Sequence, residues 1–220
     1  HTHTHSYKNL EAETGQSTGF SECGFIELAA NNDRLEEFRR VAAFNRFCGM
    51  DVHEISPQEV QKLFPLARTD DIVAGFYVPS DGRANPVDAC VALSKGARMK
   101  GAQVFEGVEV ADVTQHKGKV TGVTTTSGHH IKAEYVVNCG GMWARQLAQQ
   151  AGVNVPLQAA EHYYLITDPI EGVDRKWPVI EDPSSHAYIR EEGGGLMVGL
   201  FEPEAAAWNV ESIPSDFSFG

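Results

Sequence analysis

Apolar and polar positions along this chain follow two periods, and each period predicts the element that carries it. Apolar residues in 33–47 recur at helical spacing, whereas residues 24–28 alternate as in a half-buried strand. Residues 56–59 read Ser-Pro-Gln-Glu, a capping box with proline at the first helical position, which predicts a helix start. Residues 85–86 read Asn-Pro and predict a second helix, which runs to residue 101. Its predicted buried face is Val87, Cys90, Val91, Leu93 and Ala97.

The middle of the chain predicts a β-meander. Strands are expected over 102–105, 108–114, 120–126 and 130–133, separated in part by Lys-Gly and Ser-Gly turns. Residues 135–138 are almost continuously apolar, which is typical of a strand buried on both faces of a parallel sheet. Glycines follow at 140 and 141, and a helix is predicted over 143–151.

The last part predicts antiparallel strands at 162–167, 187–190 and 196–200, the last two joined by a glycine-rich turn. Parts of a parallel α/β layer thus alternate with parts of an antiparallel sheet. Two domains woven together along one chain would give this order. The predicted fold class is α/β of mixed α+β type.

Composition narrows the classes of protein that fit. Of 220 residues, 42% are hydrophobic and 22% charged, which is typical of a globular domain. No apolar run is long enough to predict a transmembrane helix. The net charge of −12 argues against nucleic acid and anionic membranes as partners. The four cysteines form no C-x-x-C pair, and we expect buried free thiols in a reducing compartment at Cys23, Cys48, Cys90 and Cys139.

One local pattern suits a phosphate-bearing ligand. Residues 136–144 combine a predicted strand, a Gly-Gly turn and a helix start, where close backbone approach and unpaired N–H groups favour an anion. A tight turn without a ligand would give the same pattern. The histidines His1, His3 and His5 alternate, but no nearby residue completes a zinc ligand set, so no metal site is predicted.

Several segments, in consistent order over nearly the whole chain, carry a family resemblance. The chain resembles the sarcosine dehydrogenase and dimethylglycine dehydrogenase family, which belongs to the D-amino-acid-oxidase-like superfamily. The segments that carry the resemblance are residues 10–15 (LEAETG), 77–82 (YVPSDG), 136–144 (VVNCGGMWA), 161–164 (EHYY), 170–172 (IEG) and 188–190 (YIR).

The resemblance implies an FAD enzyme that oxidises a small N-methyl amino acid by passing a hydride equivalent to the flavin. The product iminium hydrolyses to formaldehyde, or tetrahydrofolate captures its carbon in a separate C-terminal domain. The implied fold is part of a Rossmann-like FAD-binding domain interwoven with an antiparallel substrate domain. Residues 1–85 are then mainly substrate-domain and connecting elements, 86–155 FAD-binding elements with the meander, and 156–220 antiparallel substrate-domain elements.

The resemblance also implies site residues. The family's active-site histidine and tyrosine match His162 and Tyr188, and the backbone that meets adenine matches Val110. The segment that lines the flavin holds Cys139, Gly140, Gly141 and Trp143. On the residues alone, His162 also suits a core histidine, and Tyr188 a cross-strand packing residue. Arg190 could bind a substrate carboxylate or simply face solvent from its strand.

The chain departs from the family in what it lacks. The G-x-G-x-x-G fingerprint that grips the pyrophosphate is absent, as is the histidine through which some members attach FAD covalently. We therefore expect an internal fragment that alone binds FAD weakly or not at all and shows no turnover. A non-catalytic homologue, like the pyruvate dehydrogenase phosphatase regulatory subunit, is the alternative. Oxygen and an electron-transfer flavoprotein are both open as acceptor, and the expected location is the mitochondrial matrix in a eukaryote or the cytoplasm in a bacterium.

Overall fold

The computed structural model describes residues 2–213, with side chains from residue 7 onward. It divides into two compact units, each built from two stretches of chain. Unit 1 holds the residues up to Val104 together with His162–Pro203, and unit 2 holds Phe105–Glu161 and the residues from Glu204 on. The chain therefore leaves unit 1, builds most of unit 2, and returns. The assignment of 1–85, 86–155 and 156–220 to FAD-binding and substrate-binding parts stays a prediction.

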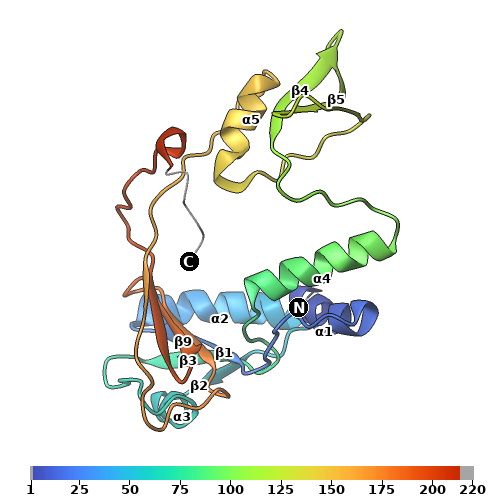
Figure 1. Ribbon diagram of the computed structural model, residues 1–220. Coiled ribbons are helices and arrows are strands. Elements are labelled where there is room, and N and C mark those ends of the chain that lie inside the picture. The colour runs from blue at the N-terminus through green and yellow to red at the C-terminus, as the bar shows by residue number, and fades with distance from the viewer. Residues whose placement is uncertain (1, 214–220) are drawn as a thin grey trace. The chain divides into compact units, whose positions relative to one another are not determined.

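Unit 1 is built on a mixed sheet of seven strands (Figure 1). All neighbouring strands are antiparallel except β1 and β8, which run parallel. The hairpin predicted around the glycine-rich turn is confirmed as β9 and β10. In spatial order the strands are β2 (His53–Ile55), β3 (Ala74–Val78), β1 (Phe25–Ala29), β8 (Val179–Asp182), β9 (Ala187–Glu192), β10 (Gly195–Leu200) and β7 (Tyr164–Ile166).

The predicted helix starts of unit 1 are confirmed. Ser56 and Glu59 form the expected capping box at α3 (Pro57–Leu63), and the Asn85 side chain accepts two backbone hydrogen bonds at the start of α4 (Pro86–Met99). Asn31 caps α2 (Asn32–Phe47) in the same way, and α1 spans Thr2–Thr14. These ends form from local hydrogen bonds, so their sequence signals are dependable.

Two hydrophobic clusters fix the sheet of unit 1 between helices. Phe38 and Ala42 of α2 pack with Phe76 of β3 on one face, and the Phe38 and Phe76 rings meet edge to face at 5.6 Å. Val60 of α3 packs with Ile26 and Ile180 on the opposite face. Figure 1 shows α2 and α3 on opposite sides of β1 and β3. The alternation predicted for residues 24–28 places its side chains on these two faces.

Unit 2 contains the predicted β-meander. Its antiparallel strands are β4 (Val110–His116), β5 (Lys119–Thr125) and β6 (His130–Lys132). A short 3₁₀ helix η1 (Gly141–Trp143) leads into α5 (Ala144–Gln150), and a second one, η2, spans Val210–Ser212. The mixed α/β fold class is therefore confirmed, with a large mixed sheet in one unit and a small antiparallel sheet in the other.

Two predicted strands are wrong. Residues 102–105 and 135–138 form no strand. Tyr135 is 86% exposed and Val137 82% exposed, so the second segment is not buried on either face. A strand forms only where its backbone groups find a partner, and among the described residues no strand pairs with 135–138. Apolar composition alone therefore misled the prediction.

The predicted buried face of α4 is wrong as well. The helix buries Ala89 and Ala92, whereas Val87, Val91 and Leu93 are exposed. All four cysteines are free as predicted, but only Cys23 is buried, whereas Cys48, Cys90 and Cys139 are exposed. Hydrophobic spacing identifies the helix correctly, but which face meets another element depends on its neighbours.

Candidate functional site

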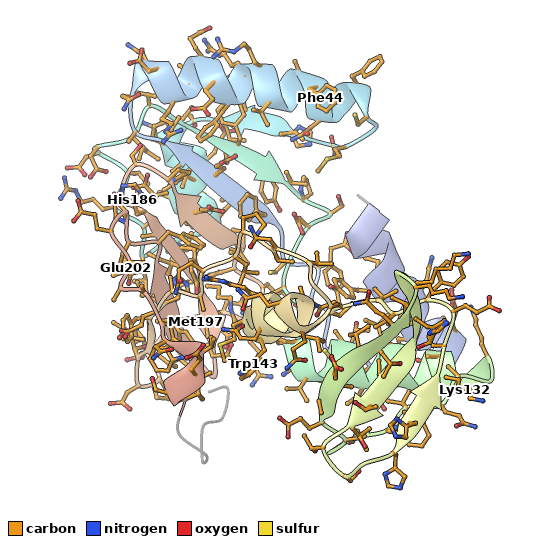
Figure 2. The ribbon with its side chains drawn as sticks, turned by 90° about the horizontal axis from the view of Figure 1, so that it is seen from above. Phe44, Lys132, Trp143, His186, Met197 and Glu202 are labelled. Carbon is orange, nitrogen blue, oxygen red and sulfur yellow. The ribbon has the colours of Figure 1, made fainter. Side chains whose placement is uncertain are left out.

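The residues predicted to act on substrate lie on or beside the strands β9, β10 and β7 of unit 1. Tyr188 and Arg190 are in β9, and His162 lies two residues before β7. Tyr188 lies opposite Gly199, which lies opposite Tyr164 on its other side. Two residues further along β9, Arg190 lies opposite Met197 of β10, which Figure 2 labels. Opposed residues and alternate residues of a strand point to the same face. Tyr188 and Arg190 therefore share one face of the sheet.

The other face of the same strands belongs to the core. Ile189 and Leu196 pack against the cluster that contains Val60 and Phe64. The face that carries Tyr188 and Arg190 is therefore the one turned away from α3.

The structure brings the predicted histidine and tyrosine together. The rings of His162 and Tyr188 are stacked with their centroids 6.3 Å apart, and Phe201 lies 5.2 Å from each. The His162 side chain is 41% exposed, so the interpretation of a core histidine is wrong. Tyr188 does make packing contacts, as its alternative interpretation expected, but these contacts join it to His162.

A carboxylate adjoins this aromatic cluster. Glu202 Oε2 lies 3.7 Å from His162 Nδ1, and both side chains are partly exposed. Glu202 is labelled in Figure 2 just after β10. The two side chains form an ion pair when the imidazole is protonated. Sequence reasoning missed Phe201 and Glu202, although these two residues directly follow the last residue of β10.

Arg190 has protein partners in this structure. Its Nη1 donates to the Glu192 carboxylate and, at 3.3 Å, to the Glu191 carbonyl. The side chain is 23% exposed and lines a polar hollow of about 310 Å³ together with Arg83 and Arg175. The guanidinium retains further N–H donors that could meet a carboxylate. Its assignment to substrate binding stays a prediction.

The predicted cofactor residues gather in unit 2. Val110 at the start of β4 and Gly140 and Trp143 before α5 line one shallow hollow of about 430 Å³. Cys139 is exposed, Gly141 begins η1 with φ +54°, and neither lines this hollow. Three of the five predicted residues therefore meet at one place, and Figure 2 labels Trp143 there.

Asn138 organises the turn that leads into this hollow. Its side chain accepts a hydrogen bond from Gly140 N at 3.1 Å and donates one to Ala144 O at 2.8 Å. A Cβ at Gly140 would meet the same Asn138 side chain at 3.1 Å, which favours glycine there. The turn thus holds Trp143 beside Val110 without the strand that the sequence predicted.

The lining of the hollow fits one planar ring system of a dinucleotide. Val110, Trp143 and Leu147 give it apolar walls. Within the described part of the chain, Gln146 Oε1 is buried and accepts no hydrogen bond. No arginine or lysine lines the hollow, so a pyrophosphate would need other residues.

Among the described residues, no group of three or more histidine, cysteine or acidic side chains could hold a metal ion. The side chains of His1, His3 and His5 lie outside the described part. From residue 2 to residue 213, no helix has the length and apolar character needed to span a membrane.

Residues 2–218 match the family model of FAD dependent oxidoreductases. The chain is 37% identical to mitochondrial sarcosine dehydrogenase of Homo sapiens, over 100% of this chain and 24% of that protein. It is 32% identical to mitochondrial dimethylglycine dehydrogenase of Rattus norvegicus, over 96% and 25%. It is also 38% identical to the mitochondrial pyruvate dehydrogenase phosphatase regulatory subunit of Mus musculus, over 89% and 23%. The chain thus spans about a quarter of the length of these curated relatives.

A solved structure shares the fold. L-proline dehydrogenase from P. horikoshii superimposes with a TM-score of 0.82 at 27% sequence identity. The match covers 92% of this chain and 54% of that protein.

Proposed function

Because the chain belongs to the family of FAD dependent oxidoreductases, we propose that the protein carrying it oxidises a small N-methyl amino acid. Sarcosine and dimethylglycine are the proposed substrates. The observation that carries the proposal is the cluster of His162, Tyr188 and Phe201 on one exposed sheet face. Relatives named for these two substrates support it.

The residues of this face have distinct proposed roles. An amine gives up a hydride from its methyl carbon only when its nitrogen is neutral. His162 therefore takes the ammonium proton at Nε2 as a general base. The Tyr188 hydroxyl donates a hydrogen bond to the substrate carboxylate or nitrogen, and Arg190 attracts the carboxylate. Phe201 and Tyr188 shield the bound N-methyl group from water.

FAD is the proposed cofactor, and when bound it would accept the two electrons that leave the amine. Val110, Cys139, Gly140, Gly141 and Trp143 are the proposed FAD residues of this chain. Val110, Gly140 and Trp143, which line one hollow, would hold one ring system. A longer protein would supply the pyrophosphate site and, if attachment is covalent, its histidine. Tetrahydrofolate as carbon acceptor, and oxygen or an electron-transfer flavoprotein as electron acceptor, remain proposals of the same kind. The mitochondrial names of the relatives support a matrix location if the source is eukaryotic.

A second candidate function rests on one observation. The chain is as similar to a pyruvate dehydrogenase phosphatase regulatory subunit as it is to the dehydrogenases. A protein of this kind could keep the fold and act as a binding partner without turnover. The presence of both His162 and Tyr188 on one face favours catalysis.

Anaerobic reduction of the flavin distinguishes the two functions. Sarcosine and dimethylglycine are added separately to the full-length protein, and the visible flavin absorbance is followed. Bleaching by either amine, lost in His162→Ala and strongly slowed in Tyr188→Phe, supports the enzyme and identifies its substrate. His116→Ala and Tyr135→Phe are matched controls because both side chains are exposed in unit 2. A protein that binds flavin but stays oxidised with every N-methyl amine is the regulatory homologue, and a protein without flavin refutes both the cofactor and the function.

A further inference from the structure

A glycine lies directly beneath the Tyr188 ring. Gly199 of β10 is the cross-strand partner of Tyr188 of β9. A Cβ built on Gly199 would stand closer than 3.0 Å to Cζ, Cε1 and Oη of Tyr188, a separation that real Cβ atoms essentially never show. The ring therefore occupies the space in which every other amino acid carries its side chain.

The backbone of Gly199 does not require glycine. Its φ is not among the positive values of this chain, and β10 pairs regularly with β9 and β7 on either side of it. Glycine within a strand normally weakens it, because glycine loses more backbone entropy on folding than other residues do and packs no side chain. The reason for glycine at this position is therefore the close approach of the tyrosine ring.

The missing side chain determines where the Tyr188 ring lies. With no Cβ in the way, the ring lies across β10 and stands 5.2 Å from Phe201 and 6.3 Å from His162. Any Cβ at 199 would push the ring by an ångström or more to reach ordinary contact distance. The hydroxyl would move with it, because Tyr has only two rotatable side-chain bonds.

We propose that Gly199 is a positioning residue for the exposed face that carries His162, Tyr188 and Phe201: because it has no side chain, the Tyr188 ring fits against β10 and is held beside the His162 ring. This rests on the proposed function for the role of Tyr188 in binding the amine. Gly199 itself need touch neither substrate nor cofactor.

A double-mutant cycle in the full-length protein tests the proposal. Gly199→Ala is made in the wild-type protein and in Tyr188→Ala, where the new methyl group has room. Each variant is measured for flavin reduction by the better N-methyl substrate and for binding of methoxyacetate, which has the shape of sarcosine without its nitrogen. We expect Gly199→Ala alone to slow reduction by roughly a hundredfold, as an ångström-scale misplacement can, and to weaken methoxyacetate binding. In the Tyr188→Ala background we expect a further change of no more than about twofold.

Gly195→Ala is the matched control. Gly195 begins the same strand, and a Cβ there would meet Thr167 and the Asp168 carbonyl but not Tyr188. Its effect should be equal in both backgrounds. If Gly199→Ala also has the same effect in both backgrounds, or none in the wild type, the glycine serves the strand and the proposal is wrong.

Thermal denaturation of the wild type, Gly199→Ala, Tyr188→Ala and the double variant distinguishes a failure of this proposal from a failure of the proposed function. If Gly199→Ala does not fold in the wild-type background, folding restored by the added Tyr188→Ala supports the contact, and continued failure to fold overturns it. An absence of flavin reduction by every N-methyl amine in the wild type overturns the proposed function. The melting temperatures then still report whether Gly199 and Tyr188 are coupled.

Discussion

A buried ion pair next to the sheet face that carries Tyr188 and Arg190 offers the sharpest test of the structure. Glu191 of β9 is 2% exposed, and its carboxylate accepts hydrogen bonds from the Arg83 guanidinium and, at 2.8 Å, from Gly194 N. Arg83 also donates to the Glu191 carbonyl. The pair thus ties the segment before α4 to the hairpin that carries Tyr188. We predict that Arg83→Met opens this hairpin.

The magnitude follows from the burial of the carboxylate. Without Arg83, a carboxylate that is almost wholly buried keeps only the Gly194 N–H and the more distant charge of Arg175. Removing one partner of a buried pair costs about 3–5 kcal/mol, whereas replacing both partners by apolar residues is often nearly neutral. The double variant Arg83→Met/Glu191→Leu should therefore recover most of the stability that Arg83→Met loses.

The stability deficit of the variant should depend on pH. Burial raises the pKa of Glu191, but the Gly194 N–H and the Arg83 guanidinium, aided by the charge of Arg175, outweigh it and lower the pKa. A lowered folded pKa adds stability that is present above the unfolded value of about 4.3 and is lost as the pH falls through the folded pKa. In Arg83→Met the hydrogen bond and charge of Arg83 no longer lower the pKa of Glu191, so this pKa rises above its wild-type position. The stability that the variant lacks depends on the ionised carboxylate, so the deficit should shrink as the pH falls.

Hydrogen exchange in peptides that cover residues 187–200 measures the opening of the hairpin. The measurement can be made on this chain or on a longer protein that contains it. A loss of about 3 kcal/mol or more corresponds to exchange that is roughly a hundredfold faster. Thermal denaturation at about pH 7 and about pH 4 then reports the predicted closing of the gap. Exchange within about threefold of the wild type, or a deficit that grows in acid, would refute this account of the pair.

Two further substitutions test local features of unit 1. Ser56→Ala removes the capping box of α3 and should lower the melting temperature, since such a cap contributes about 0.5–2 kcal/mol; an unchanged melting temperature would contradict the observed cap. Glu27→Gln should stabilise the protein at neutral pH by a few tenths of a kcal/mol up to about 1 kcal/mol, because burial and then the charge of its cross-strand partner Glu181 raise the pKa of Glu27. Ionisation of a group with a raised pKa destabilises the fold, so this gain should vanish as the pH falls below about 4.3, and a gain that persists in acid would show that charge is not its cause.

Local signals determined much of the fold from the sequence. The capping box at Ser56, the Asn85-Pro86 helix start and the glycine-rich turn between β9 and β10 each form from residues within a few positions of one another. Hydrogen bonds and backbone preferences at that range do not depend on the rest of the molecule. The meander of unit 2 was found for the same reason.

The tertiary structure decided every question that involves a neighbour. Residues 135–138 have the composition of a buried strand, yet they remain exposed because no described strand offers their backbone a partner. The apolar spacing of α4 fixed the helix but not the buried face, which consists of Ala89 and Ala92. Burial is a property of two surfaces, and the sequence of one segment describes only one of them.

The candidate site divides in the same way. The family resemblance picked out His162 and Tyr188 one by one, but the sequence held no sign that their rings would meet around Phe201. Gly199 gave no signal either, because a glycine in a strand resembles a defect until its cross-strand partner is known. Residue identity sets what each group can do chemically. The pairing of strands far apart in the chain sets which groups can act together, since only the folded sheet brings them within contact distance.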